Sequence, residues 1–219
     1  MIHPDTELRF INSEIGYGIF ATSYIAKGTI VYVKDDLEIE VSELKFDAMD
    51  QRHKDIVEKY SYTDERGVRI LSWDHAKYIN HSCDCNTMST GYGFEIAIRD
   101  IAQGEEITDE YGLFNITEPV AINCQCTDCR KMLLPTDIDR YYRSWDILVQ
   151  EAVEYIYHVE QPLWDVMDAQ TKSEIIQYLA SQSDYRSVLN LKYQHNMVKQ
   201  DGGIADVKCQ QNPEIAISF

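Results

Sequence analysis

The first half of the chain consists of short runs rich in β-branched and aromatic residues, separated by turns. This is the pattern of β-strands. Strand-type runs occupy residues 7–11, 18–25, 29–41, 68–73, 76–80, 93–101 and 104–111. Tyr78 and Ile79 resemble the end of one buried strand, directly before the polar cluster at residues 80–86. We therefore expect a core built mostly from short strands.

Two segments change from a period of two to helical spacing. Apolar residues recur every three or four positions in residues 42–60, which predicts a helical insertion. After Pro135 a longer apolar stripe follows, made of Ile138, Tyr142, Trp145, Leu148, Val149, Ala152, Ile156 and Val159. Asp137 is the expected N-cap of this helix and Pro162 its stop. Residues 171–174 have the pattern of a capping box for a further helix.

Composition restricts the class of protein. With 219 residues and 44% hydrophobic residues, the chain is long enough for one folded domain plus an extension. No run of about eighteen apolar residues predicts a membrane span, and the first residues lack the pattern of a signal peptide. We expect an intracellular protein, cytoplasmic or nuclear, with reduced cysteines and no membrane partner. The oligomeric state is left open.

The net charge of −17 bears on binding partners. A strongly acidic chain repels phosphate backbones, so we expect no direct binding of nucleic acid. The same charge attracts basic, lysine-containing proteins. Acidity that serves only solubility is the alternative.

Three cysteines lie within six residues, at Cys124, Cys126 and Cys129. Closely spaced thiolates are natural ligands of Zn²⁺, which takes four in a tetrahedron. Cys83 or Cys85 is the expected fourth ligand. The alternative is a set of reduced thiols without metal. A catalytic zinc is disfavoured, because no histidine has a partner at ligand spacing.

Motifs along the chain occur in the order of one known family. They are GYG at residues 16–18, YINHSCDCN at 78–86 and GEEITDEYG at 104–112, followed by the cysteine segment. This order resembles a SET-domain protein-lysine methyltransferase with a post-SET zinc motif. The resemblance covers residues 7–131. The GYG turn alone is common, whereas the other two motifs at their spacing are specific.

The resemblance implies a fold and a set of roles. The fold is a mostly β SET fold of short sheets with a pseudoknot and a helical insertion, here with an α-helical C-terminal extension. S-adenosylmethionine (AdoMet) is implied on one face, and a channel for the substrate lysine on the other. Tyr111 matches the catalytic tyrosine, and the resemblance selects Cys83 over Cys85 for structural zinc. The implied AdoMet-binding residues are Tyr17, Gly18, Asn80 and His81, with Leu133 as a cover over the cofactor.

The chemistry fits these roles. Free lysine has a pKa of about 10.4 and arrives charged, yet only the neutral amine attacks a sulfonium methyl group. An apolar channel and the sulfonium both disfavour the ammonium form. The hydroxyl of Tyr111 suits orientation of the amine better than proton removal, because an unperturbed tyrosine has a pKa of about 10. His81 is a base by residue type, but the resemblance favours a role in shaping the cofactor site.

Departures from the family pattern concern the lysine channel and the cysteines. Asp109 stands where the family has an aromatic residue that helps decide how many methyl groups fit, so the methylation state is unpredictable. Cys85 stands where the family has proline, and the cysteine spacing is shorter than usual. Tyr62, or Tyr60, is expected in the channel wall. Asp109 is expected either to hold the incoming ammonium or to face solvent.

The expected organisation has four parts. Residues 1–115 are the SET domain, 116–134 the post-SET cysteine segment, 135–198 the helical extension and 199–219 a polar tail without stable order. The expected function is AdoMet-dependent methylation of lysine in a basic protein such as a histone tail. The rivals are a catalytically silent SET fold that binds AdoMet or a peptide, and a zinc-stapled scaffold whose apolar helical stripe docks a partner.

Overall fold

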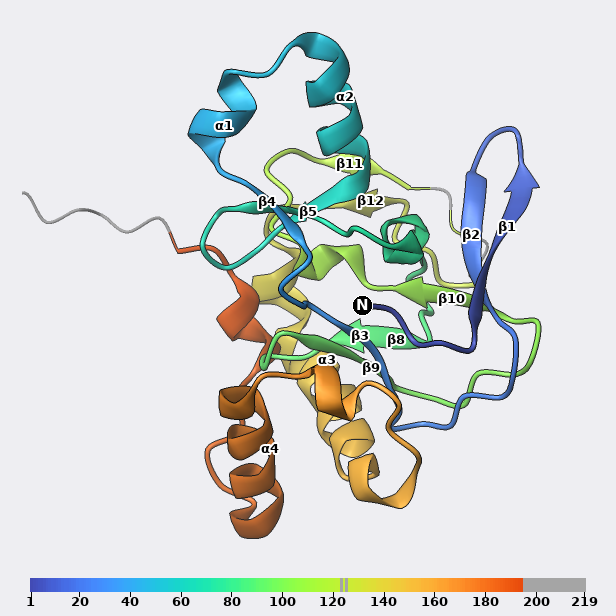
Figure 1. The fold of residues 1–219 in the computed structure, drawn as a ribbon, viewed down its shortest axis with the longest axis vertical. Helices are drawn as coiled ribbons and strands as arrows, with labels where there is room; N and C mark the ends of the chain where they lie inside the picture. The colour runs from blue at the N-terminus through green and yellow to red at the C-terminus, as the bar shows by residue number, and fades with distance from the viewer. Residues whose placement is uncertain (123, 125, 195–219) are drawn as a thin grey trace, which may run out of the picture.

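The computed structural model describes residues 1–122, 124 and 126–194. The tail expected at 199–219 lies outside these residues, so that prediction stays open. Small β-sheets form the middle of the molecule, with one pair of helices at one end and another pair toward the opposite end (Figure 1). The predicted class, short sheets with a helical insertion and a helical C-terminal extension, is confirmed. Within the described residues, no helix is both long and apolar enough to cross a membrane.

One sheet carries most of the motif residues. Its strands are ordered β1 (Thr6–Asn12), β2 (Gly16–Ala21), β10 (Glu106–Asp109) and β7 (Asn80–His81). Strand β10 pairs antiparallel with β2 and parallel with β7. The GYG, NHS and GEEIT motifs, far apart in sequence, therefore meet on neighbouring strands.

Further small sheets complete the β region. One contains β3 (Ile30–Val33), β9 (Phe94–Ala97) and β8 (Thr87–Ser89), and every residue of these three strands is buried. Another contains β4 (Ile39–Val41), β6 (Arg69–Leu71) and β5 (Ser61–Thr63). Strands β11 (Val120–Ala121) and β12 (Met132–Leu133) form a short pair across the cysteine segment.

The strand expected at residues 76–80 was wrong. His75–Tyr78 form a 3₁₀ turn, capped by the Asp74 carboxylate, which accepts a hydrogen bond from Ala76 N at 2.9 Å. Ile79 is extended, and the two-residue strand β7 begins at Asn80. The local Asp cap outweighed the strand preference of the aromatic and branched side chains.

The helical insertion is present as α1 (Glu43–Asp47) and α2 (Gln51–Tyr60). Each begins at a capping side chain, Ser42 or Asp50, that accepts a backbone N–H from the first turn. Phe46 and Val57 are the buried residues of these helices, and with Val41 they make a small satellite core. The insertion thus folds over the β4–β6–β5 sheet with little hydrophobic area of its own.

The C-terminal helices differ from prediction at their ends. Helix α3 spans Asp137–Val153 and begins after Thr136, so Asp137 is its first residue rather than its cap. Pro162 does not end α3, because the helix already ends at Val153. The 3₁₀ turns Ile156–His158 and Trp164–Val166 lie between α3 and α4.

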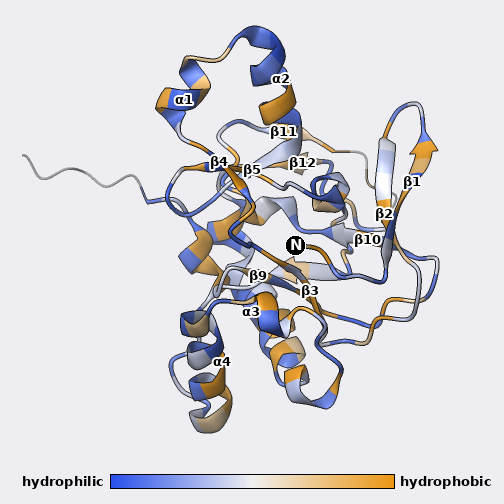
Figure 2. Ribbon diagram, viewed as in Figure 1, coloured by the Kyte–Doolittle hydropathy of each residue, from blue (hydrophilic) through white to orange (hydrophobic). Residues whose placement is uncertain are grey.

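Helix α4 spans Ala169–Ser181 and starts earlier than expected. The Asp168 carboxylate accepts the N–H of Thr171 at 2.9 Å, so Asp168 is the cap and the expected capping box is wrong. Its buried residues, Ile175 and Tyr178, are three positions apart, as on one face of a helix. Figure 2 shows both hydrophobic and hydrophilic residues along α4.

The apolar stripe of α3 is core. Ile138, Trp145, Val149 and Ala152 are each at most 6% exposed and belong to the same buried cluster as Phe94 of β9. Full burial of one such side chain stabilises by about 1.5–3 kcal/mol. Leu148 is exposed, at 38%, and Tyr142 and Val159 are half-buried. The stripe is therefore covered by this chain's own β region, which removes the main argument for the docking scaffold.

Candidate active site and cysteine cluster

The expected cofactor residues meet beside the end of β10. The Asn80 side-chain amide donates to the Tyr17 carbonyl at 3.0 Å and to Glu106 Oε1 at 2.8 Å. Gly18 lies in the same place, and a Cβ there would come within 2.5 Å of Glu106 Oε1 and 2.7 Å of Ile11 Cδ1. Glycine at this position thus leaves room for the side chains of Glu106, Ile11 and Asn80. The Tyr17 ring remains about half exposed and contacts Phe10 and Tyr78 edge-on.

His81 joins this region to the cysteine cluster. Its Nδ1 lies 3.1 Å from the Asp109 carbonyl and 3.3 Å from Tyr111 N, and its Nε2 lies 3.4 Å from Cys83 Sγ. Burial, followed by the positive charge of Arg130, lowers the pKa of His81 to about 4. The ring is therefore neutral at neutral pH, which fits a shaping role better than a role as base.

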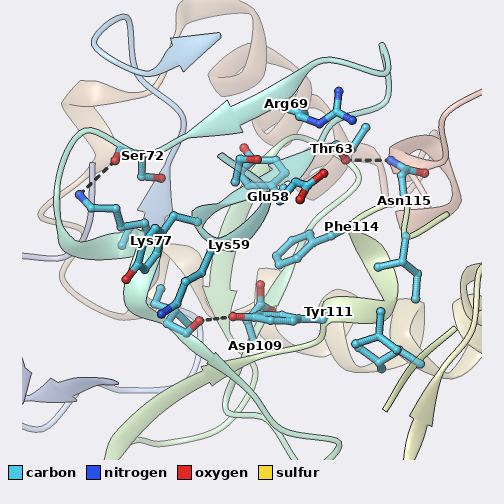
Figure 3. A pocket seen from close by; sticks show the side chains of 18 of the residues that line it. Glu58, Lys59, Thr63, Arg69, Ser72, Lys77, Asp109, Tyr111, Phe114 and Asn115 are labelled. Carbon is cyan, nitrogen blue, oxygen red and sulfur yellow. Dashed lines mark hydrogen bonds between the residues drawn. The ribbon is translucent and has the colours of Figure 1, made fainter. Parts of the chain in front are cut away.

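A cavity of about 410 Å³ begins where β10 ends. Tyr111, Asp109, Tyr62 and Leu133 line it, whereas Tyr17, Gly18, Asn80 and His81 do not. Figure 3 shows Tyr111 and Asp109 beside each other in this cavity, with Phe114 next to them. Tyr60 also lines the cavity, so both tyrosines considered for the channel wall are present. Leu133, expected over the cofactor, is 1% exposed and belongs to the cavity wall.

Tyr111 is held by its hydroxyl, which donates a hydrogen bond to the Ile79 carbonyl. Burial, then the nearby charges of Asp109 and Glu95, raises the pKa of Tyr111 above its ordinary value. The phenol is therefore protonated at neutral pH and can orient a group but not remove a proton. Its ring packs 5.3 Å from the Phe114 ring, centroid to centroid.

The carboxyl of Asp109 does not face solvent, since the residue is 1% exposed. Burial raises its pKa to about 7. Beside it lies the buried carboxyl of Glu95, a residue that the sequence reasoning missed. A signal for Glu95 existed, because an acidic residue interrupts the otherwise apolar run Phe94–Ala97.

The cysteines converge as expected on one point. The Sγ atoms of Cys83, Cys124, Cys126 and Cys129 all lie within 4.8 Å of one another. A tetrahedron with Zn–S bonds of about 2.3 Å places its sulfurs about 3.8 Å apart, so this donor set suits Zn²⁺ in number, type and spacing. Cys85 is buried at 5% exposure and stands outside the group.

Arg130 ties the cysteine cluster to the core. The backbone N–H of Arg130 donates to Cys83 Sγ at 3.5 Å. Its guanidinium forms ion pairs with Glu110 Oε1 and, at 3.4 Å, with Asp137 Oδ2. The same guanidinium lies over the rings of Tyr141 and Trp145. The first turns of α3 are thereby fixed against the cluster.

These motifs lie in a segment that matches one protein family model. The SET domain family model matches residues 16–112. A curated relative, the histone-lysine N-methyltransferase trr of Drosophila melanogaster, is 29% identical over 130 residues, which is 54% of this chain. The chain spans 5% of that relative's length.

Solved structures were compared as well. The crystal structure of KRYPTONITE in complex with mCHG DNA and SAH is 20% identical, with a TM-score of 0.42, over 59% of this chain and 29% of that one. The methyltransferase domain of human histone-lysine N-methyltransferase SETMAR is 14% identical, with a TM-score of 0.41, over 61% of this chain and 58% of that one.

Proposed function

We propose that the chain, whose residues 16–112 match the SET domain family model, is an AdoMet-dependent protein-lysine N-methyltransferase. The observation that carries the proposal is the position of Tyr111. Tyr111 is the last residue but one of the matched segment, and it lines a cavity together with Tyr60, Tyr62 and Phe114. A cavity of about 410 Å³ has room for a long, flexible side chain such as lysine.

The cavity wall supports the role of a lysine channel. Tyr62 lies 5.1 Å from Phe114, and Phe114 lies 5.3 Å from Tyr111, centroid to centroid. These rings exclude water from the path of the side chain, which disfavours its ammonium form. The Tyr111 hydroxyl and the Ile79 carbonyl are placed to orient the amine. Orientation of reacting groups contributes on the order of 7–11 kcal/mol in favourable cases.

AdoMet would supply an electrophilic methyl group. Tyr17, Gly18, Asn80 and His81 would hold it, with Leu133 at the boundary with the channel. Their fit rests on the accessible Tyr17 ring and on the neutral imidazole of His81, which adds no charge beside a sulfonium. Because these residues flank the end of β10, a cofactor there would lie close to Tyr111.

The four clustered cysteines would hold a structural zinc ion. Cys83 follows the NHS motif, and the other three belong to the segment after the SET domain. The ion would fasten that segment, including Leu133, onto the channel.

The substrate is inferred from charge. A net charge of −17 favours a basic protein, and the name of the trr relative points to histones among such proteins. A histone substrate would favour a nuclear location.

The test is transfer of radiolabelled methyl from AdoMet to core histones and to proteins of a whole-cell lysate. Tyr111→Phe should lose activity on the order of 100-fold, because it removes the hydroxyl that orients the amine. Tyr157→Phe is the matched control, since Tyr157 is 59% exposed on the C-terminal region. Absence of label from every protein, with AdoMet binding intact, would support a silent binding module instead.

A further inference from the structure

Two buried carboxyls meet inside the proposed lysine channel. Asp109 ends β10 and Glu95 lies in β9, and both line the cavity that contains Tyr111. The residues are 1% and 7% exposed. The two carboxyls are close enough that, in addition to burial, the charge of Asp109 raises the pKa of Glu95. Nothing in the roles given above uses this pair.

The pair lacks donors. Asp109 Oδ1 accepts the N–H of Glu110 at 2.7 Å, but Asp109 Oδ2 and Glu95 Oε2 have no protein donor. An ionised carboxylate only accepts hydrogen bonds, so two ionised groups cannot satisfy each other. One proton, held on Glu95 and donated to Asp109, supplies the missing bond. Glu95 is therefore neutral and donates a hydrogen bond to Asp109. Asp109 is the carboxyl of the pair that can ionise.

The surrounding charges do not neutralise the pair. No ion pair within the described residues joins Asp109 or Glu95 to a lysine or arginine. The charged and titratable groups that interact with the pair are the amino group of Met1, Glu38, Glu110, Tyr62, Tyr111 and Cys85. The same cavity is also lined by Tyr32, Glu58, Lys59, Tyr60, Arg69, Lys77 and Glu118. The amino group of Met1 forms ion pairs with Asp35 and Glu38, and Glu110 forms an ion pair with Arg130. Burial raises the pKa of Asp109 to about 7 and that of Glu95 well above its ordinary range.

We propose that Asp109, held by the protonated side chain of Glu95, takes the proton that the substrate amine must lose before methyl transfer. This inference rests on the proposed methyltransferase function. It makes Asp109 a catalytic residue and Glu95 a positioning residue.

Proton transfer from the lysine ammonium to Asp109 precedes methyl transfer. One N–H bond of the lysine ammonium breaks, its electron pair stays on nitrogen, and the proton forms an O–H bond on Asp109. The neutral nitrogen then attacks the AdoMet methyl carbon, a C–N bond forms, the C–S bond breaks, and the sulfonium becomes a neutral thioether. Asp109 later returns its proton to solvent.

Burial in the cavity brings the pKa values of the lysine ammonium and the Asp109 carboxyl closer together. Removal from water lowers the pKa of an amine and raises that of a carboxyl, so both changes favour transfer. A sulfonium beside the nitrogen lowers the amine's pKa further. An aromatic side chain at position 109 has no group that accepts this proton, so the departure from the family pattern changes the chemistry of the channel end.

A direct test measures the protonation of Asp109. The full chain is labelled with ¹³C at aspartate carboxyl carbons and titrated by NMR, and Asp109→Asn identifies the resonance. We expect an apparent pKa of about 7. With AdoMet present at pH above 7, n-butylammonium should move this resonance to its protonated position. Butyltrimethylammonium has no proton to give and should not.

Kinetics provide the second test. Asp109→Asn should lower kcat on the order of 100-fold or more, with KM for AdoMet unchanged, as for loss of a general base. The wild-type rate should fall as pH drops below about 7. Glu95→Gln keeps a hydrogen-bond donor toward Asp109 and should retain this fall in rate below about pH 7. Glu95→Ala should abolish the fall or move it to another pH. Glu160→Gln, an exposed carboxylate on the C-terminal region, is the control.

The outcomes separate the two proposals. An Asp109 resonance that titrates below pH 5, or one that n-butylammonium drives toward the ionised form, overturns the inference whether or not the chain transfers methyl groups. An Asp109→Asn variant with the wild-type rate and pH profile overturns it as well. Proton uptake by Asp109 without methyl transfer to any protein would support the carboxyl pair and count against the proposed function.

Discussion

At the scale of the residue, position 109 shows how one side chain changes a site. The fold buries a carboxyl at this position, in the wall of a cavity that aromatic side chains also line. Its pKa of about 7 exceeds the ordinary value of about 3.9, so the folded state binds more protons than the unfolded state between these values. The free energy of unfolding therefore falls as pH rises from about 4 to 7.

Asp109→Asn should remove this destabilisation. At pH 8 the free energy of unfolding, measured by urea denaturation, should be higher in the variant than in the wild type by on the order of 2–4 kcal/mol. The reason is that the variant buries no charge at this position. At pH 4 both chains carry a neutral side chain at this position, and the difference should be small. Equal differences at the two pH values would show that Asp109 is not the group that couples stability to pH here.

At the scale of the element, the cysteine segment is held by side chains from distant parts of the chain. Its strands β11 and β12 have two residues each, which is too short for independent stability. Arg130 and the four thiols supply what the ladder lacks. The segment should therefore depend on its metal more than the sheets do.

Metal content tests the ligand set. Cys83→Ser should lower bound zinc, measured by elemental analysis of the purified chain, from one equivalent to a small fraction. Cys85→Ser is the matched control two residues away, and it should keep its zinc because Cys85 lies outside the cluster. Loss of zinc from Cys85→Ser with retention in Cys83→Ser would reverse the assignment.

At the scale of the whole molecule, the C-terminal extension and the β region share one core. Phe94 and Ile96 of β9 belong to the same buried cluster as Trp145 and Val149 of α3. The predicted boundary at residue 135 therefore separates segments of sequence, not independent cores. The domain boundaries themselves remain predictions.

Truncation of Trp145 should destabilise the entire chain. Trp145→Ala removes a ring that is 6% exposed and should cost about 3–5 kcal/mol of unfolding free energy. Ile147→Ala, on the same helix but 57% exposed, should change stability by less than about 1 kcal/mol. Calorimetry should show one transition for each variant. A separate early transition in Trp145→Ala would indicate that the extension folds on its own.

The sequence analysis found elements that follow a repeating pattern and missed boundaries that a single side chain sets. Helix 42–60 and the strands near residues 7–11, 18–25 and 93–101 depend on local pattern, and they were found. The turn at residues 75–78 and the start of α4 were missed, because in each a single Asp carboxylate binds a nearby N–H and decides the local structure. Such caps are readable in principle, but they compete with propensity over the same few residues.

The sequence by itself determined the motifs, their order and the chemistry that they offer: a tyrosine after GEEIT, an NHS segment and closely spaced thiols. The family resemblance had already selected Cys83 over Cys85 for the cluster, and the structure brings Cys83 there. Only the tertiary structure decided that Glu95 and Asp109 line the same cavity. The reason is that strand order and burial are set by contacts between residues far apart in the chain. Those contacts turned an unusual aspartate into half of a buried acid pair.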